Sequence, residues 1–421
     1  MPLLLYTVLF YILSPFLVLR LLQRSLKAPA YRRRIAERFG FFTCPAMEKS
    51  LWVHAVSVGE VIAAIPLIRE LQSRYPDHVV VVTTMTPTGS ERVRDMLGDS
   101  VFHVYAPYDL PFSLKRFMAK TRPALLLIME TEIWPNMVCC ARDAGVPVVL
   151  ANARLSEKSA RGYARLRALT EAVFSRFSRI VAQTEADAER FRSLGAESGQ
   201  VLVSGSVKFD ITIDDALREQ ALAERNAWQA DRRPVWICAS THEGEESMIL
   251  EAFSRVRAAV PEALLLVAPR HPERFDAVAA LIERSGLGCA RRSHGDEVSG
   301  VAVLLLDTMG ELKLLFGCAD VASVGGSFIP RGGHNSLEPA AWGLPLVNGP
   351  SDYNFLEISA LLQQAGALTL ADSTETLARE VLGLLQDDAV RQQRGDAAIG
   401  VIEANRGALG RLLGVIDGVL S

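Results

Sequence analysis

Beyond residue 50, short apolar runs alternate with amphipathic segments along the chain. The apolar runs have the length of buried strands, and the segments between them repeat apolar positions at helical spacing. This alternation predicts parallel sheets covered by helices on both faces. A first block predicts strands at Leu51–Ala55, Val79–Thr83, Leu125–Met129, Val146–Ala151, Arg179–Ala182 and Val201–Ser204. A second block predicts strands at Val235–Ala239, Ala263–Ala268, Val301–Leu306, Val321–Val324 and Leu346–Asn348.

The turn between the two blocks, near residues 210–215, predicts a domain boundary. We expect an α/β protein with two doubly wound domains, at residues 25–210 and 211–421, facing each other across a cleft. The length of 421 residues suits two or three domains. Ligands of such folds bind beyond the carboxyl ends of the strands, so the loops at those ends are the first place to look for a site.

The N-terminus has a different pattern, because Leu3–Leu19 contains no charged residue. A helix of this length is about 26 Å long, slightly short of a bilayer core of about 30 Å. A secretory signal peptide fits poorly, since no basic region precedes the run and no cleavage site follows it. A buried core helix is the other alternative. We expect residues 1–24 to be a membrane anchor that spans the bilayer or inserts deeply.

A basic cluster follows this segment and contains a single acid, Glu37. By the positive-inside rule it predicts that the body of the chain lies in the cytoplasm. Such a cluster also suits anionic lipid head groups. Its members are Arg20, Arg24, Lys27, Arg32, Arg33, Arg34 and Arg38.

Composition narrows the class of protein. The chain is 49% hydrophobic and 22% charged, which excludes a disordered protein, and its net charge of −3 gives no reason to expect a nucleic-acid partner. The cysteines show no C-x-x-C spacing, so we expect neither disulfides nor a structural zinc site. They are Cys44, Cys139, Cys140, Cys238, Cys289 and Cys318.

Four predicted strands end in small polar loops that open helices. The loops begin at His54, Ser240, Asp307 and Gly325, and the last continues through Gly332 and Gly333. Glycines let a backbone approach a ligand closely, and helix N-termini offer unpaired N–H groups to anions. The loops therefore indicate a site for a phosphate-bearing ligand. A structural alternative is a set of capping boxes, formed by Ser57 with Glu60, Ser240 with Glu243, Thr308 with Glu311 and Asn335 with Glu338.

Charged residues near these strand ends supply candidate chemistry. Glu60 and Glu130 follow strands of the first domain, and one of them could take a proton from an attacking hydroxyl. Lys208 and Arg270 could meet negative charge, although a solvated lysine is an equally good interpretation of Lys208. The chain has no G-x-x-x-x-G-K-[ST], no G-x-G-x-x-G after a first strand and no D-x-D, which disfavours a P-loop, a dinucleotide site and a metal-bound sugar nucleotide.

The ordered motifs resemble those of the 3-deoxy-D-manno-octulosonic acid (Kdo) transferases across nearly the whole chain. The motifs are SVGE (57–60), TMTPTGSERV (84–93), METEIWPNM (129–137), ANARLS (151–156), GSVKFD (205–210), STHEGEE (240–246), PRHPERF (269–275), DTMGEL (307–312) and VGGSF…RGGHNSLEPA (324–340). The resemblance implies a GT-B glycosyltransferase that moves Kdo from CMP-Kdo to the lipid A precursor at the inner membrane, with inversion and with neither metal nor cofactor.

Residue roles follow from the same resemblance, motif by motif. It implies that Glu60 is the general base and that Glu130 and Lys208 stabilise the transition state. It places contacts to CMP at Pro269, Arg270, Met309, Gly310, Glu311, Asn335, Ser336, Leu337 and Glu338. The alternatives left open are a UDP-sugar glycosyltransferase, a sugar-nucleotide 2-epimerase and a non-catalytic, membrane-tethered binding protein.

Overall fold

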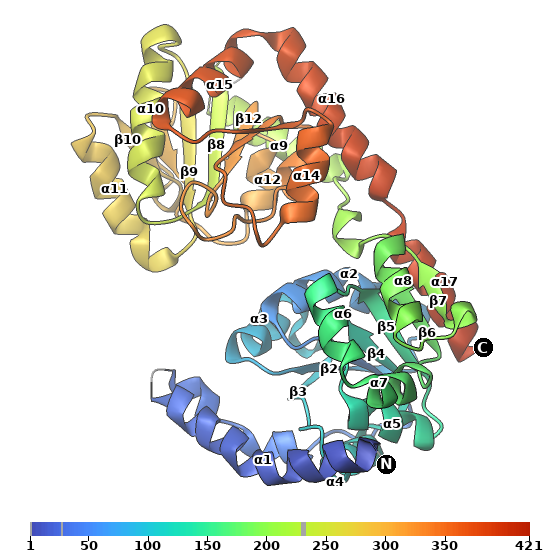
Figure 1. The fold of residues 1–421 in the computed structure, drawn as a ribbon. Coiled ribbons are helices and arrows are strands. Elements are labelled where there is room, and N and C mark those ends of the chain that lie inside the picture. Colours follow the sequence, from blue (N-terminus) through green and yellow to red (C-terminus); the bar gives the residue numbers. More distant parts are fainter. Residues whose placement is uncertain (1, 27, 229–232) are drawn as a thin grey trace. The chain divides into compact units, whose positions relative to one another are not determined.

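The structure is a computed structural model that describes residues 2–26, 28–228 and 233–421. Lys27 of the basic cluster lies outside the described residues. The described chain forms two compact units, residues 1–210 with 406–421 and residues 211–405 (Figure 1). Each unit is built around a parallel sheet of seven strands, as the described residues show. The predicted α/β class with two Rossmann-like domains is confirmed.

The sheet of unit 1 has the order β3-β2-β1-β4-β5-β6-β7. The strand order reverses between β1 and β4, which pair in parallel, and doubly wound folds bind ligands at such a reversal. Its strands are β1 (Ser50–His54), β2 (Val79–Thr84), β3 (Phe102–Tyr105), β4 (Pro123–Met129), β5 (Val148–Ala153), β6 (Arg179–Ala182) and β7 (Val201–Val203). Its helices are α1 (Pro2–Ser25), α2 (Val58–Arg74), α3 (Pro87–Leu97), α4 (Pro111–Thr121), α5 (Pro135–Asp143), α6 (Glu157–Ala164), α7 (Arg167–Phe174), α8 (Glu185–Ser193) and α17 (Ala408–Leu420).

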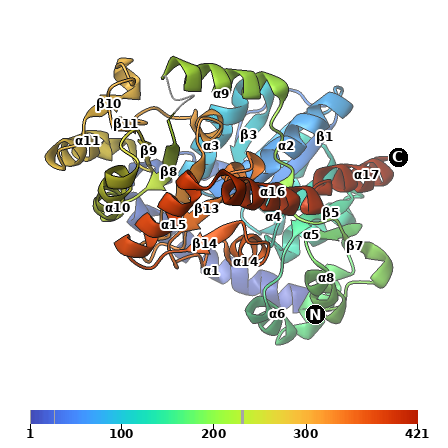
Figure 2. The same ribbon diagram turned by 90° about the horizontal axis from the view of Figure 1, so that it is seen from above.

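The sheet of unit 2 has the order β10-β11-β9-β8-β12-β13-β14, with its reversal between β8 and β12. Figure 2 shows α10 and α11 side by side at the β10 edge of this sheet. Its strands are β8 (Val235–Thr241), β9 (Leu264–Pro269), β10 (Cys289–Arg291), β11 (Val303–Leu305), β12 (Val321–Val324), β13 (Leu346–Asn348) and β14 (Leu368–Leu370). Its helices are α9 (Asp215–Ala227), α10 (Glu245–Ala259), α11 (Phe275–Arg284), α12 (Leu312–Phe316), α13 (Leu337–Ala341), α14 (Leu356–Gln364), α15 (Thr374–Gln386) and α16 (Asp388–Asn405).

Three strands were missing from the sequence prediction, and all three lie at a sheet edge. They are β3, β10 and β14. An edge strand has one neighbour and needs less apolar surface than a central strand. Residues such as His103 and Arg291 therefore interrupt the apolar pattern that marks the central strands.

The last helix, α17, packs on unit 1, whereas the sequence analysis placed residues 211–421 in one domain. Leu412, Leu413 and Ile416 are buried in the same core cluster as the apolar face of α2. The carboxylate of Asp210 accepts hydrogen bonds from the N–H groups of Gly407 and Leu409, at 2.6 Å each. The helix is amphipathic, but the sequence pattern does not reveal which sheet its apolar face covers.

Helix α1 is long and apolar enough to cross a membrane. One side of it packs on unit 1, where Leu21 joins a buried cluster with Tyr108 and Leu110. The Tyr6 hydroxyl donates a hydrogen bond of 2.9 Å to Oδ2 of the buried Asp109. The other side carries exposed apolar side chains, among them Leu4, Leu5, Val8, Leu9, Ile12, Phe16 and Leu19. A continuous exposed apolar face of this kind fits membrane association.

The basic cluster after α1 divides into exposed and engaged residues. Arg32 and Arg33 are exposed. Nε of Arg34 lies 2.6 Å from Oε1 of Glu37, and Arg34 and Arg38 both stack on the ring of Tyr105, at 4.6 and 4.4 Å from its centroid. Arg38 is fully buried. Part of the predicted lipid-binding cluster is thus committed to internal contacts.

Candidate active site

The strand reversal of unit 1 brings two carboxylates to one edge of the sheet. His54, the last residue of β1, pairs with Ile128 of β4. Glu60 lies in the first turn of α2, which begins four residues after β1 ends, and Glu130 directly follows β4. The carboxyl ends of neighbouring parallel strands meet at the same edge, so Glu60 and Glu130 lie together where a doubly wound sheet binds ligands.

Glu60 is held at the start of α2 by hydrogen bonds that also affect its pKa. Its N–H donates to Oγ of Ser57, while its carboxylate accepts from the Ser57 hydroxyl at 2.7 Å and from the N–H of Val56 at 2.9 Å. Burial raises the pKa of Glu60 to about 7, against these hydrogen bonds and with help from the carboxylates of Glu132 and Glu130. A carboxyl group with this pKa is suited to exchange protons near neutral pH.

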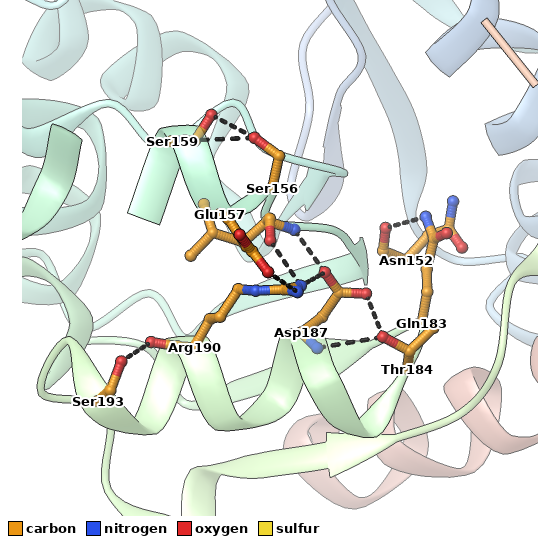
Figure 3. A network of polar contacts seen from close by, with 10 residues as sticks. Asn152, Ser156, Glu157, Ser159, Gln183, Thr184, Asp187, Arg190 and Ser193 are labelled. Carbon is orange, nitrogen blue, oxygen red and sulfur yellow. Dashed lines mark hydrogen bonds and ion pairs between the residues drawn. The ribbon is translucent and has the colours of Figure 1, made fainter. Parts of the chain in front are cut away.

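Glu130 is paired with Lys208, with 2.8 Å between Oε1 and Nζ. Glu130 adopts a left-handed backbone conformation at φ +53°, unusual for a residue with a side chain. Lys208 is placed by the turn after β7, because Oδ1 of the buried Asn152 accepts a hydrogen bond from the N–H of Val207 at 3.2 Å. The carbonyl of Asn152 in turn accepts from Nε2 of Gln183 at 2.9 Å (Figure 3).

Three further side chains border this site and were absent from the predicted set. Oε2 of Glu132 accepts a hydrogen bond from the indole of Trp134 at 3.1 Å, and burial raises the pKa of Glu132. Trp134 packs edge-on against His54, with ring centroids 4.8 Å apart. Burial lowers the pKa of His54 to about 3, so this histidine is neutral. The sequence signal was the pair of acids two residues apart in one loop.

In unit 2, the backbone after β12 comes very close to the end of β8, where the strand order reverses. A Cβ on Gly325, which follows β12, would lie 2.7 Å from Cα of Thr241 at the end of β8. The side chain of Glu245 fills the space beyond, accepting hydrogen bonds from the N–H groups of His242, Gly326 and Phe328 at 2.8 to 3.0 Å. The expectation that the N–H groups of this loop face phosphate is therefore wrong for Gly326 and Phe328. The Ser240–Glu243 capping box is wrong as well, because α10 begins at Glu245 after Gly244.

The predicted nucleotide residues gather at the carboxyl edge of the unit 2 sheet. Pro269 ends β9, the segment 309–311 follows β11, and the segment 335–338 follows β12. Pro269, Ser336 and Leu337 are buried, so ligand contacts there would fall mainly on the backbone. Met309 is 57% exposed, Gly310 has φ +90°, and the remaining side chains, Arg270, Glu311, Asn335 and Glu338, are partly exposed.

The pKa values of two acids at this edge are shifted in opposite directions. Oε1 of Glu311 lies 3.1 Å from Arg292, and the hydrogen bonds from Arg292 and Thr308 lower the pKa of Glu311. Burial raises the pKa of Glu338, whose charge is favoured by Lys313 and Asn335. The helices α12 and α13 that follow these loops have only five residues each, so their contribution to binding an anion rests on backbone N–H groups more than on a helix dipole.

Three histidines form a cluster beside these loops and were not in the predicted site. Nε2 of His242 lies 2.7 Å from Nε2 of His334, and the ring of His271 packs 5.3 Å from that of His242. Burial and neighbouring cations lower the pKa of His242 and lower that of His334 to about 4. The sequence places each histidine in a different loop, so only the fold shows that they meet. Within the described ranges, no group of three or more His, Cys, Asp or Glu side chains is arranged to hold a metal ion.

Comparison with known proteins identifies the family. Residues 33–211 match the family model described as 3-deoxy-D-manno-octulosonic-acid transferase. The chain is 42% identical to the 3-deoxy-D-manno-octulosonic acid transferase of Haemophilus influenzae, over 98% of this chain and 97% of that protein. It is 40% identical to the enzyme of the same name from Bordetella pertussis, over 94% of this chain and 92% of that protein.

The solved structure of the UDP-GlcNAc 2-epimerase from Neisseria meningitidis is similar in fold. Its TM-score is 0.58 at 18% identity, over 88% of this chain and 99% of that one. This likeness shows the fold alone, whereas the two relatives above share both length and sequence with the chain. The chain therefore belongs to the 3-deoxy-D-manno-octulosonic acid transferase family and is a glycosyltransferase.

Proposed function

We propose that this protein moves Kdo from CMP-Kdo to a hydroxyl of the lipid A precursor, with inversion at the anomeric carbon and with Glu60 as the general base. The observation that carries the mechanism is the buried carboxyl group of Glu60, with a pKa of about 7, beside the Glu130–Lys208 pair. The family supports the Kdo transfer, and the site geometry supports the assignment of roles.

The role of Glu60 follows from its proton affinity. The acceptor hydroxyl is a poor nucleophile until a base takes its proton, and a base works best when its pKa is near the working pH. The hydrogen bonds from Ser57 and Val56 fix the carboxylate at the end of β1. The acceptor oxygen attacks the anomeric carbon, its proton passes to Glu60, and the bond from that carbon to the CMP phosphate breaks with the electron pair leaving on CMP.

Glu130 and Lys208 act on the charge that develops during transfer. The anomeric carbon gains positive character, which a carboxylate stabilises, as in glycosidases. The ion pair with Lys208 holds the Glu130 carboxylate in place. Fixed charges of this kind stabilise a transition state without reorganising during the reaction.

Unit 2 is assigned the donor, through the nine residues that the family resemblance marks for CMP. Arg270 lies at the end of β9, and its N–H donates to the carbonyl of Thr241 at 2.9 Å. The donor carries a phosphate and a sugar carboxylate, and Arg270 supplies positive charge at this edge. Unit 1 is assigned the acceptor, with residues 1–24 as its membrane anchor.

The acceptor is a lipid, which accounts for the exposed apolar face of α1. We place the protein on the cytoplasmic face of the inner membrane, in contact with its lipids. The basic residues after α1 favour this side of the membrane, and Arg32 and Arg33 are free to meet anionic head groups.

The test is CMP release from CMP-Kdo in the presence of a tetraacylated disaccharide lipid A precursor and EDTA, beside a panel of UDP-sugars. The proposal predicts turnover with CMP-Kdo and with none of the UDP-sugars. It also predicts a product lipid that is heavier by the mass of one or more Kdo units. Turnover with a UDP-sugar instead would favour a different glycosyltransferase. Lipid binding with no turnover of any donor would favour a membrane-tethered binding protein.

A further inference from the structure

An apolar pocket lies in unit 1 between α1, the start of α5 and the α6–α7 pair. Its volume is about 220 Å³, and its walls include Tyr6 of α1, Pro135 of α5, and Tyr163, Leu166 and Phe174 of the α6–α7 region. Sites that enclose a drug-sized molecule measure about 300–1,000 Å³, so this pocket suits a single narrow apolar group better than a sugar nucleotide.

The pocket adjoins the membrane-facing helix. Tyr6 extends from the packed side of α1 and is fixed by its hydrogen bond to Asp109. The other side of α1 carries the exposed apolar row that includes Leu5, Ile12 and Phe16. Leu166 on the pocket wall is itself 62% exposed. An apolar group that enters here would come from the membrane that α1 contacts.

Positive charge is interleaved with the pocket wall. Lys158, Arg161 and Arg165 are all exposed; the first two precede Tyr163 in the chain, and Arg165 directly precedes Leu166. In the part of the chain that the structure describes, none of the three has an acid within ion-pair distance. Cations without an internal partner beside an apolar pocket suit a ligand that carries an anionic group close to an apolar chain.

Helix α6 is held in a fixed position by the polar network of Figure 3. The buried Asp187 of α8 accepts hydrogen bonds from the N–H of Leu155 at 2.8 Å and from the Thr184 hydroxyl at 2.6 Å. Arg190 donates to the carbonyl of Leu155 at 3.0 Å. These bonds fix the residues just before the Ser156 cap of α6, and so fix the start of the helix that carries Lys158 and Arg161.

The pocket also connects to the candidate active site through one loop. Ile133 and Pro135 line the pocket and lie in the loop that begins at Glu130. The carboxylate of Glu132, in the same loop, contributes to the raised pKa of both Tyr163 on the pocket wall and Glu60. The pocket therefore borders the loop that carries Glu130 and Glu132.

We propose that this pocket binds one acyl chain of the phosphorylated lipid acceptor, while Lys158, Arg161 and Arg165 meet its phosphate. The inference rests on the proposed function and names the part of the acceptor that unit 1 recognises. The occupant is the substrate lipid and not a bulk phospholipid, because the pocket leads to the loop of Glu130 and Glu132.

The first experiment fills the pocket from its rim with Leu166→Trp, which replaces an exposed side chain and leaves the core intact. Leu222→Trp on α9 is the matched control, because Leu222 is also exposed, at 60%, and lies in unit 2. kcat/KM is measured for the tetraacylated acceptor and for its fully deacylated analogue. We expect the wild type to prefer the acylated acceptor at least tenfold, Leu166→Trp to lose most of this preference through a higher KM, and Leu222→Trp to keep it.

The outcomes separate this inference from the proposed function. If Leu166→Trp and the wild type prefer the acylated acceptor equally, or if the wild type has no such preference, the acyl-chain site is wrong. The proposal of Kdo transfer is not affected by either result. Absence of transfer to either acceptor by the wild type overturns both.

A second measurement identifies the occupant directly. An acceptor with a photoreactive acyl chain should label residues 160–175 of the wild type and label Leu166→Trp at least fivefold less. Labelling of this segment by a photoreactive phospholipid, undiminished by excess acceptor, would overturn the assignment to the acceptor.

Discussion

Nζ of Lys208 lies 2.8 Å from Oε1 of Glu130, which joins the turn after β7 to the end of β4. The Lys208 side chain is 32% exposed, so the pair adds little to stability, at most about 1 kcal/mol. We propose that its importance is for catalysis, because it holds the Glu130 carboxylate in place.

Lys208→Met should therefore lower kcat by about 100-fold, the usual effect of removing one preorganised electrostatic group. Glu130→Gln should have a similar effect, and the double variant should lose much less than the product of the two losses, since both disable one unit. Kinetics of the four proteins, with melting curves to confirm folding, measure this coupling. Fully multiplicative losses would show that the two residues act independently.

The raised pKa of Glu60 predicts the pH dependence of the reaction. Glu60 accepts a proton only when ionised, so kcat/KM should fall tenfold per pH unit below about pH 7 and level off above it. The Ser57 hydroxyl bond lowers this pKa, so Ser57→Ala should move the acid limb to higher pH. A pH profile of kcat/KM for both proteins tests this. If the acid limb of the profile lies at the same pH in Ser57→Ala and in the wild type, a group other than Glu60 causes it.

Gly325 should tolerate no side chain. A Cβ there would lie 2.7 Å from Cα of Thr241. The backbone of β8 would have to move to make room for it, which lowers stability. Gly325→Ala should lose about 1–3 kcal/mol of unfolding free energy and weaken donor binding, because the loop to residue 338 begins there. Gly300→Ala is the control, since a Cβ at Gly300 would meet nothing within 4 Å. Chemical denaturation and CMP titration should separate the two variants, and equal behaviour would contradict the close approach.

Arg32 and Arg33 should contribute to membrane binding, whereas Arg34 should contribute to the stability of the fold. The first two are exposed, and each is worth about 1 kcal/mol at an anionic surface. The double Ala variant should bind anionic vesicles about 30-fold more weakly at low salt, while the exposed Arg284→Ala should bind as the wild type does. Arg34→Ala should instead lower the melting temperature, because Arg34 pairs with Glu37 and stacks on Tyr105. Vesicle sedimentation and thermal melts check both, and unchanged binding by the double variant would remove the lipid role.

The sequence predicted those features that depend on one strand and the loop after it. Glu60 and Glu130 follow buried apolar runs, and parallel strands present their carboxyl ends together, so their shared edge could be anticipated. The position of Lys208 depends on Asn152, which holds Val207 from a strand two places away in the sheet. Nothing in the local pattern of residues 205–210 reveals that contact.

The features that could not be predicted depend on tertiary packing. The three missed strands lie at sheet edges, where burial is incomplete, and α17 returns to unit 1 through Asp210. Glu245 accepts hydrogen bonds from two N–H groups of the glycine-rich loop that the sequence analysis expected to face a phosphate. His242, His271 and His334 come from three separate loops and meet only when the sheet has formed.

The most direct test of the account is CMP release from CMP-Kdo with the tetraacylated acceptor in EDTA, for wild type, Glu60→Gln and Glu70→Gln. Glu70 lies on the same helix but is exposed, where it pairs with Arg74 at 3.5 Å, so its variant controls for the loss of a carboxylate from α2. The account predicts full turnover by the wild type and Glu70→Gln, and a loss of at least about 100-fold in Glu60→Gln. Turnover by a folded Glu60→Gln within a few fold of the wild type would contradict it.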